Sequence, residues 1–139
     1  MVDQNCAYCM EGELVAKFGI KICELETSKV YLFKEQSHSG RCIVAHKKHV
    51  GDMNELTAEE RAAYFEDVAR VARAIMKAFN PDKVNYGAYG DTGHHLHFHL
   101  CPKYKDEYEW GGVFLMNPDK KYLTDEEYAD MIEKIKANL

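Results

Sequence analysis

The sequence predicts an α+β domain: a sheet of about five mostly antiparallel strands, one long central helix and a C-terminal helix. Two segments follow a capping box with apolar residues at intervals of three and four, which is typical of amphipathic helices. Five short runs rich in β-branched and aromatic residues indicate strands. Because three of these runs precede the long helix and two follow it, an α+β arrangement is favoured.

The strand runs occupy residues 20–26, 29–35, 41–47, 83–90 and 95–102 of the 139-residue chain. A short "TS" connection at residues 27–28 joins the first two runs and predicts a hairpin. A chain of this length buries roughly two-thirds of its unfolded surface, so a single domain with a real core is expected.

The two helices have clear ends. In the segment 56–81, Thr57 and Glu60 form a capping box, and the helix should stop before Pro81. Near the C-terminus, Thr124 and Glu127 form a second capping box. The apolar stripes predicted to face the core are Phe65, Val68, Ala72, Ile75 and Phe79 in the first helix, and Tyr128, Met131, Ile132, Ile135 and Leu139 in the second.

Composition narrows the class of protein. Hydrophobic residues make up 46% and charged residues 29%, which is typical of a globular domain. The net charge is −5 and the basic residues are scattered, so no binding of long nucleic acid is expected. Because no signal peptide or membrane span is recognisable, we expect a cytoplasmic protein with reduced thiols and no membrane partner. Cys23, Cys42 and Cys101 lie in apolar runs and should be buried.

The stretch "TGHHLHFHLCP" (residues 92–102) contains four of the seven histidines. Side chains alternate along a strand, so His95, His97 and His99 should share the face opposite the core. The outer two lie about 13 Å apart at roughly 3.3 Å per residue, too far for one metal ion to bind all three. A His-x-His pair with a distant ligand could still hold zinc, and a solvated polar face is the alternative without chemistry.

The chain resembles the histidine triad (HIT) superfamily. "HLHFHLC" is similar to its His-φ-His-φ-His-φ-φ signature, where φ is apolar, while "KVYLFKE" and "GRCIVAHKKHVGDMNEL" resemble the strands and turn that precede it. The resemblance covers roughly residues 6–102 and implies a single HIT domain over 1–139. Its parts are a zinc knuckle and helix (1–19), a core (20–102) and a specificity segment with a helix (103–139). A homodimer is implied as well.

The resemblance implies a role for each site residue. His97 would attack the α-phosphorus of a purine nucleotide, His99 would hydrogen-bond the phosphate, and His95 would orient His97 partly through its carbonyl group. Asn85, Gly90 and Thr92 fall near the phosphate, and Asp91 stands where the family often has Gln. Glu35 lies nearest the acidic residue that binds ribose, although an ordinary surface Glu is the alternative. Candidates for the base pocket are Leu14, Phe18, Ile20 and Phe33.

Cys6 and Cys9 form a Cys-x-x-Cys pair, which is the usual knuckle for two thiolates on one zinc ion. A redox pair is the alternative, but the motif does not lie at a strand-to-helix junction. The resemblance implies that His49 and His95 complete the site, with His46 and His94 as competitors. A Cys2His2 site has no open position, so this zinc would be structural.

The resemblance implies a nucleotide hydrolase or transferase, as a nucleoside phosphoramidase or dinucleoside polyphosphate hydrolase, with a nucleotidyl-histidine intermediate on His97. Two other classes stay open: a metallohydrolase with catalytic zinc on the histidine row, and a nucleotide-binding module without turnover. The leaving group is left open among amine, nucleotide, sulfate and sugar phosphate. Residues 103–122 are candidates for specificity, with Trp110 either stacking on substrate or packing.

Overall fold

A computed structural model describes residues 3–139 of the chain. Two short helices precede the first strand, a long helix separates the third and fourth strands, and a C-terminal helix follows the last strand. The elements are α1 (Ala7–Met10), α2 (Gly12–Ala16), β1 (Gly19–Glu24), β2 (Ser28–Phe33), β3 (Cys42–His46), the 3-10 helix η1 (Met53–Glu55), α3 (Ala58–Phe79), β4 (Lys83–Gly87), β5 (His97–Lys103) and α4 (Asp125–Ala137).

The five strands form one sheet in the order β1-β2-β3-β5-β4, and all four pairings are antiparallel. The predicted α+β class and the hairpin between the first two strands are confirmed. β5 lies between β3 and β4, and His99 pairs with Ile43 on one side and Gly87 on the other. The second half of the histidine motif is therefore in the interior of the sheet.

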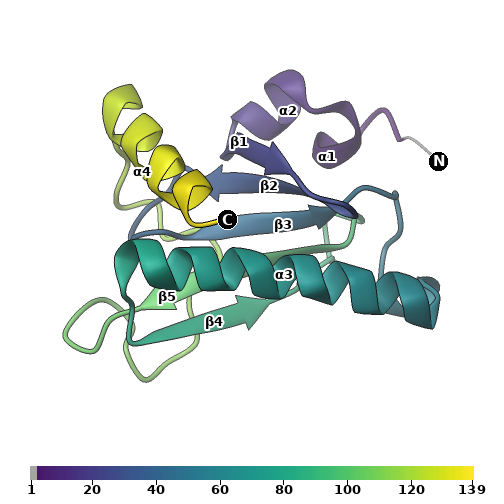
Figure 1. The fold of residues 1–139 in the computed structure, drawn as a ribbon. Helices are drawn as coiled ribbons and strands as arrows, with labels where there is room; N and C mark the ends of the chain where they lie inside the picture. Colours follow the sequence, from purple (N-terminus) through teal and green to yellow (C-terminus); the bar gives the residue numbers. More distant parts are fainter. Residues whose placement is uncertain (1–2) are drawn as a thin grey trace.

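The two faces of the sheet are covered differently. α3 runs along one face with α4 beside it near β1 (Figure 1), and both helices contribute to the main hydrophobic core. On the other face, Tyr8 of α1 and the nearby Val15 pack on a smaller cluster with Tyr31, Phe33, Ile43 and Ala45. Leu96, Phe98 and Leu100 pack against the main core, so the odd-numbered residues of β5 point to the face covered by α1.

The long helix begins and ends as its sequence predicts. Thr57 accepts a hydrogen bond from the Glu60 backbone N–H, and the Glu60 side chain accepts one from Thr57. Asn80 ends the helix in the left-handed conformation (φ 50°), just before Pro81. The prediction is wrong for one residue of the apolar stripe: Phe65 is 36% exposed, and its neighbour Tyr64 is buried instead. The stripe is therefore rotated by one residue at its start.

The thiols partly match the prediction of burial. Cys42 and Cys101 are buried, whereas Cys23 is only partly buried, and none of the five cysteines forms a disulfide. Within residues 3–139, no helix has the length and apolar character needed to cross a membrane.

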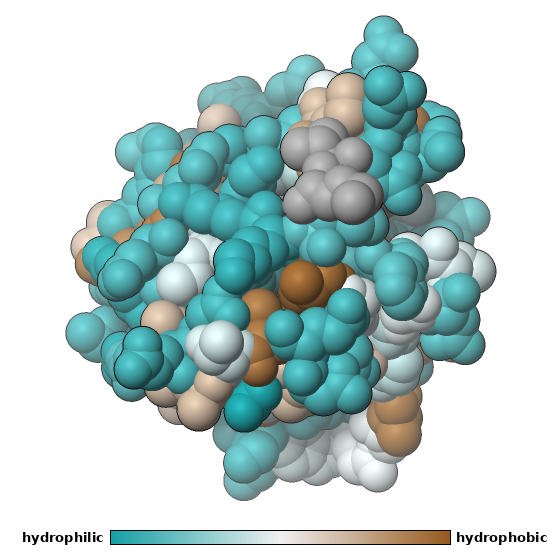
Figure 2. All heavy atoms as spheres, turned by 90° about the vertical axis from the view of Figure 1, so that its right-hand side faces the viewer, coloured by the Kyte–Doolittle hydropathy of each residue, from teal (hydrophilic) through white to brown (hydrophobic). Residues whose placement is uncertain are grey.

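α3 starts at the same end of the molecule at which β4 ends and β5 begins (Figure 1). Figure 2 looks onto this end, where the surface is mostly hydrophilic and a small group of hydrophobic spheres lies in a recess near the middle. The loops 47–57 and 88–96 meet here, so the candidate site is built at this end.

Candidate functional site

Four side chains converge at the start of α1. Sγ of Cys6 lies 3.2 Å from Nδ1 of His95, and Sγ of Cys9 lies 3.3 Å from Nδ1 of His49. Nδ1 of His49 and Nδ1 of His95 are 3.1 Å apart, and all four ligand atoms lie within 4.8 Å of one another. A tetrahedral zinc ion with bonds of about 2.0–2.3 Å would separate its ligands by roughly 3.3–3.8 Å. The cluster could therefore hold a metal ion of this size.

The surroundings of His95 also fit a metal ligand. Nε2 of His95 lies 2.6 Å from the carbonyl oxygen of His46, so Nε2 carries the ring proton and Nδ1 keeps its lone pair toward the cluster. Metal-bound histidines commonly donate their second N–H in this way. Burial lowers the pKa of His95 to about 4. The ring is therefore neutral near pH 7, which is the form that binds metals.

The two competing histidines lie elsewhere. Nδ1 of His46 accepts a hydrogen bond from the Lys48 backbone N–H, and its ring packs against Tyr64 of α3. His94 lines the neighbouring cleft. Within residues 3–139, the group of Cys6, Cys9, His49 and His95 is the one cluster of three or more metal-binding side chains.

His97 is held in one ring orientation by its own strand. Its Nδ1 lies 2.6 Å from the carbonyl oxygen of His95, so Nδ1 donates and Nε2 keeps a lone pair. Burial lowers the pKa of His97, which favours the neutral imidazole. Within residues 3–139, no side chain or backbone group hydrogen-bonds Nε2, so this nitrogen is available to an incoming group.

A cleft of about 450 Å³ opens beside His97. The loops that follow β3 and β4 form its walls, with Gly51, Asp52 and Met53 on one side and Tyr89, Gly90, Asp91 and His94 on the other. No lysine or arginine lines the cleft, whereas two carboxylates do. Thr92 lies in the same loop and is exposed.

The histidine row is not an exposed face. His95, His97 and His99 are 2%, 9% and 3% exposed. The Tyr8 ring of α1 covers the first two, with centroid distances of 5.4 and 5.0 Å. The alternative of a solvated polar face therefore does not hold, because α1 covers this part of the strand.

His99 has a partner that sequence reasoning missed. The buried guanidinium of Arg41 places Nη2 at 3.0 Å and Nε at 3.3 Å from Nδ1 of His99. Burial, and then the nearby Arg41 charge, lower the pKa of His99 to about 2. Arg41 is the first residue of the predicted strand run 41–47, but no local pattern distinguishes it from an exposed basic residue.

Glu35 is not an ordinary surface residue: it is 2% exposed. Its carboxylate accepts hydrogen bonds from the Ser37 backbone and hydroxyl, and from the backbone N–H groups of Lys120 and Lys121, at 2.6–2.9 Å. These four donors lower its pKa by more than burial raises it. Glu35 thus joins the loop after β2 to the segment before α4, and its oxygens are already engaged by the chain.

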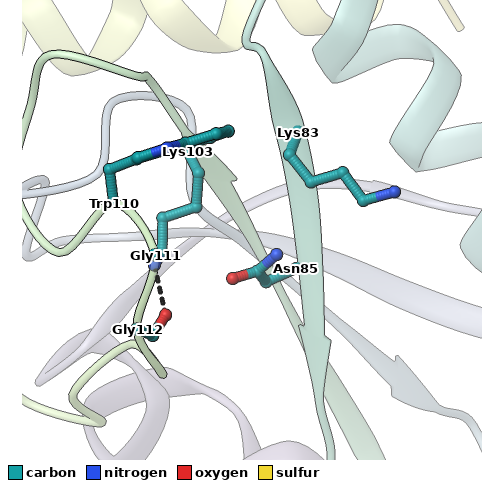
Figure 3. A pocket seen from close by; sticks show the side chains of 6 residues that line it. All are labelled: Lys83, Asn85, Lys103, Trp110, Gly111 and Gly112. Atoms are coloured by element: carbon teal, nitrogen blue, oxygen red, sulfur yellow. Dashed lines mark hydrogen bonds between the residues drawn. The ribbon is translucent and has the colours of Figure 1, made fainter.

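Asn85 does not lie beside His97. It pairs with Cys101, four residues along β5 from His97, or about 13 Å at roughly 3.3 Å per residue. The Asn85 amide points into a separate pocket of about 290 Å³ (Figure 3) lined also by Lys83, Lys103, Trp110, Gly111 and Gly112. The sequence could indicate that Asn85 lies on the same face of the sheet as His97, but it could not indicate the register of β4 against β5.

The proposed base-pocket residues do not all share one face: Phe18 and Phe33 belong to the smaller cluster under α1, whereas Ile20 does not. Phe33 lies under the Arg41 guanidinium, 4.2 Å from its ring centroid. Phe18 packs edge-on against Tyr8 with a centroid distance of 5.8 Å. Leu14 and Ile20 are partly buried, and Ile20 packs against the main core on the opposite face.

The chain is similar to known proteins in sequence and in fold. A family model described as "HIT domain" matches residues 20–106. An adenosine 5′-monophosphoramidase of Schizosaccharomyces pombe is 28% identical over 116 residues, covering 77% of this chain and 80% of that protein.

Two solved structures share the fold. A histidine triad protein of Sinorhizobium meliloti superposes with a TM-score of 0.84 at 23% identity, covering 92% of this chain and 95% of the other. A zinc-bound histidine triad family protein of Mycobacterium smegmatis superposes with a TM-score of 0.67 at 22% identity, covering 95% and 93%.

Proposed function

The chain belongs to the HIT domain family, and on that premise we propose that it hydrolyses a nucleoside phosphoramidate or dinucleoside polyphosphate at the α-phosphate. The observation that carries the proposal is the 2.6 Å contact between Nδ1 of His97 and the His95 carbonyl oxygen. It fixes the ring proton on Nδ1 and leaves Nε2 as a nucleophile beside a cleft. The phosphoramidase among the relatives supports this class of substrate.

The reaction proceeds in two displacements at phosphorus. Nε2 of His97 attacks the α-phosphorus, a bond from nitrogen to phosphorus forms, and the bond to the leaving group breaks. The leaving group departs with the electron pair and takes up a proton from solvent. Water then attacks the same phosphorus and loses a proton to solvent, while the bond between phosphorus and Nε2 breaks with its electron pair returning to Nε2. The nucleoside monophosphate is released, and His97 is again neutral with its proton on Nδ1.

His99 follows His97 on the same face of β5 and supports the phosphate. Its Nδ1 accepts from Arg41, so its Nε2 carries the hydrogen and can donate to a phosphate oxygen. Loss of one such donor typically costs a few kcal/mol of transition-state stabilisation. His99→Ala should therefore slow turnover less than loss of the nucleophile.

We also propose that Cys6, Cys9, His49 and His95 hold a structural zinc ion. The zinc-bound relative supports this assignment, as do the contacts among the four ligand atoms. Bound zinc would tie the start of α1 to β5 and to the turn after β3, which keeps the Tyr8 ring over His97. All four ligand positions are filled by the chain, so the zinc has no part in the displacement steps.

The test compares His97 with a histidine of the same cleft. Because His97 is buried against Tyr8, His97→Asn is preferable to His97→Ala, which would leave a cavity. His97→Asn should abolish hydrolysis of adenosine phosphoramidates and diadenosine polyphosphates, while His94→Ala should keep most of it. Mass spectrometry of acid-free quenched protein should detect a nucleotidyl adduct on His97.

Turnover by His97→Asn at more than a few per cent of the original rate would refute the proposal. Tight AMP binding without turnover of any substrate would favour a binding module instead. Activity that disappears with zinc while the protein stays folded would favour the metallohydrolase. The homodimer stays a prediction, which analytical ultracentrifugation would test.

A further inference from the structure

Arg41 carries a buried positive charge against the third histidine of the triad. Its side chain is fully buried, and both Nη2 and Nε donate to Nδ1 of His99, at 3.0 and 3.3 Å. A guanidinium group has donors and no acceptor, so Nδ1 of His99 must be the acceptor. The proton of the neutral His99 ring is therefore on Nε2.

The guanidinium is fixed from every side. It lies between the rings of Phe33 and Phe114, 4.2 and 4.9 Å from their centroids. Nη1 donates to the carbonyl oxygen of Leu115 at 3.2 Å, and Nη2 to that of Met116 at 2.9 Å. Two aromatic rings and two carbonyl groups thus hold the guanidinium in this orientation.

Nε2 of His99 has no hydrogen-bond partner within residues 3–139. In that range the one buried side-chain nitrogen or oxygen without a partner is Nε2 of His46, so Nε2 of His99 keeps access to solvent. The N–H that Arg41 sets on Nε2 is thus the one offered to a ligand.

We propose that Arg41 is a positioning residue for His99: it holds the ring with Nδ1 as acceptor and so presents Nε2–H as a fixed donor to the substrate phosphate. The inference rests on the proposed function for the identity of the ligand. A donor from a charged group also polarises the imidazole, which strengthens the Nε2–H bond to an anion. Arg41 thus gives His99 a cationic partner without protonating it.

The charged and titratable groups around His99 support this reading. Arg41 faces it from the start of β3 and His97 from β5, while β2 and the segment after β5 contribute the rings of Phe33 and Phe114. At its paired position, β4 contributes Gly87. The carboxylates of Glu35 and Glu109 influence Arg41 rather than His99.

The first experiment is nitrogen-15 NMR of the His99 ring between pH 5 and 8. The unsubstituted protein should have His99 as the Nε2–H tautomer with no titration in this range. In Arg41→Met, His99 should lose its single Nε2–H tautomer and populate Nδ1–H as well, because no donor then holds Nδ1 as the acceptor. At pH 8, Arg41→Met should also bind AMP at least tenfold more weakly, as measured by calorimetry.

Two further variants separate orientation from folding. Arg41→Gln keeps an N–H donor without the charge, so it should restore the tautomer and part of the AMP affinity. Glu109→Gln weakens the hydrogen bonds that the Leu115 backbone N–H donates to the Glu109 carboxylate. This loosens the covering segment but leaves Arg41 in place. It should leave the tautomer of His99 unchanged.

The inference is overturned if His99 of the unsubstituted protein is protonated on Nδ1. It is also overturned if Arg41→Met keeps the Nε2–H tautomer alone, or if Glu109→Gln shows the same change of tautomer as Arg41→Met. None of these readings requires turnover. If no nucleotide is hydrolysed and the tautomer is as expected, the proposed function fails while the role of Arg41 stands.

Discussion

Nε2 of His95 lies 2.6 Å from the carbonyl oxygen of His46, which turns the lone pair of Nδ1 toward the two thiols of α1. Protein purified without added zinc should therefore contain about one zinc ion per chain. A Cys6→Ser/Cys9→Ser variant should contain far less and melt at a lower temperature, because the free energy of zinc binding supports folding. Metal analysis and calorimetry would measure both.

Cys23→Ser is the matched control for this prediction, since Cys23 is partly buried and packs against the main core, away from the cluster. It should keep its zinc. Equal zinc content in the double variant and the control, or none in either, would reject the metal site.

Asp91 should influence the choice of leaving group. Its carboxylate lines the cleft beside His97, so it repels a polyphosphate leaving group more than an amine. At about 6 Å in water, one unit of charge contributes roughly 0.7 kcal/mol, or about threefold in rate. Asp91→Asn should raise kcat/KM for diadenosine polyphosphates about threefold relative to phosphoramidates, and by less at high salt.

The control is Asp130→Asn on α4, which removes the same charge from an exposed position outside the cleft. An equal effect from both variants would assign the change to net charge and not to the position of Asp91.

Glu35 should make stability depend on pH. Although burial raises its pKa, hydrogen bonds from Ser37, Lys120 and Lys121 lower it below the usual value near 4.5. A carboxyl group with a lowered folded pKa stabilises the protein fully above its unfolded pKa, and the contribution is lost as pH falls through the folded pKa.

The free energy of unfolding of the unsubstituted chain should therefore fall from about pH 4.5 downward. Glu35→Gln should have a lower free energy of unfolding at pH 7, and this free energy should depend less on pH below pH 4.5. Urea unfolding at a series of pH values measures this. Parallel profiles for the two proteins would contradict the prediction.

Asp67 should be a main anchor of α3. Its Oδ2 accepts hydrogen bonds from the Thr27 backbone and hydroxyl and from the Ser28 hydroxyl, at 2.7–2.9 Å. Because the carboxylate is buried and its three donors would lose their partner, Asp67→Ala should cost about 2 kcal/mol or more. The exposed neighbour Glu66→Gln should change the free energy of unfolding by less than about 0.5 kcal/mol. Similar urea midpoints for both variants would argue against this anchor.

Local sequence patterns predicted the helices and strands well, because helix capping and side-chain alternation depend on residues close together in the chain. The capping boxes at Thr57 and Thr124 place both helix starts, and both are present in the structure. Alternation along β5 predicted which residues face the core. The resemblance to the HIT family supplied the set of four metal-binding side chains, which the fold brings together.

What the sequence did not reveal depends on contacts between distant segments. The place of Asn85 follows from the pairing of Gly87 with His99, and a shift of two residues would have moved it beside His99. The role of Arg41 depends on Leu115 and Met116, 74 and 75 residues later. No periodicity carries such information, so buried polar partners were the least predictable part of the site.

The bonds made by Glu35 and Arg41 also bear on the order in which the molecule is assembled. Two backbone partners of each side chain lie 74–86 residues further along the chain. On a ribosome, the first three strands emerge long before the residues that complete their environment, and contacts of such separation close late. A nascent chain that ends before Leu115 would lack the two carbonyl groups that accept hydrogen bonds from Nη1 and Nη2 of Arg41. The position of Arg41 against His99 should therefore become fixed only after the chain has been synthesised beyond Met116.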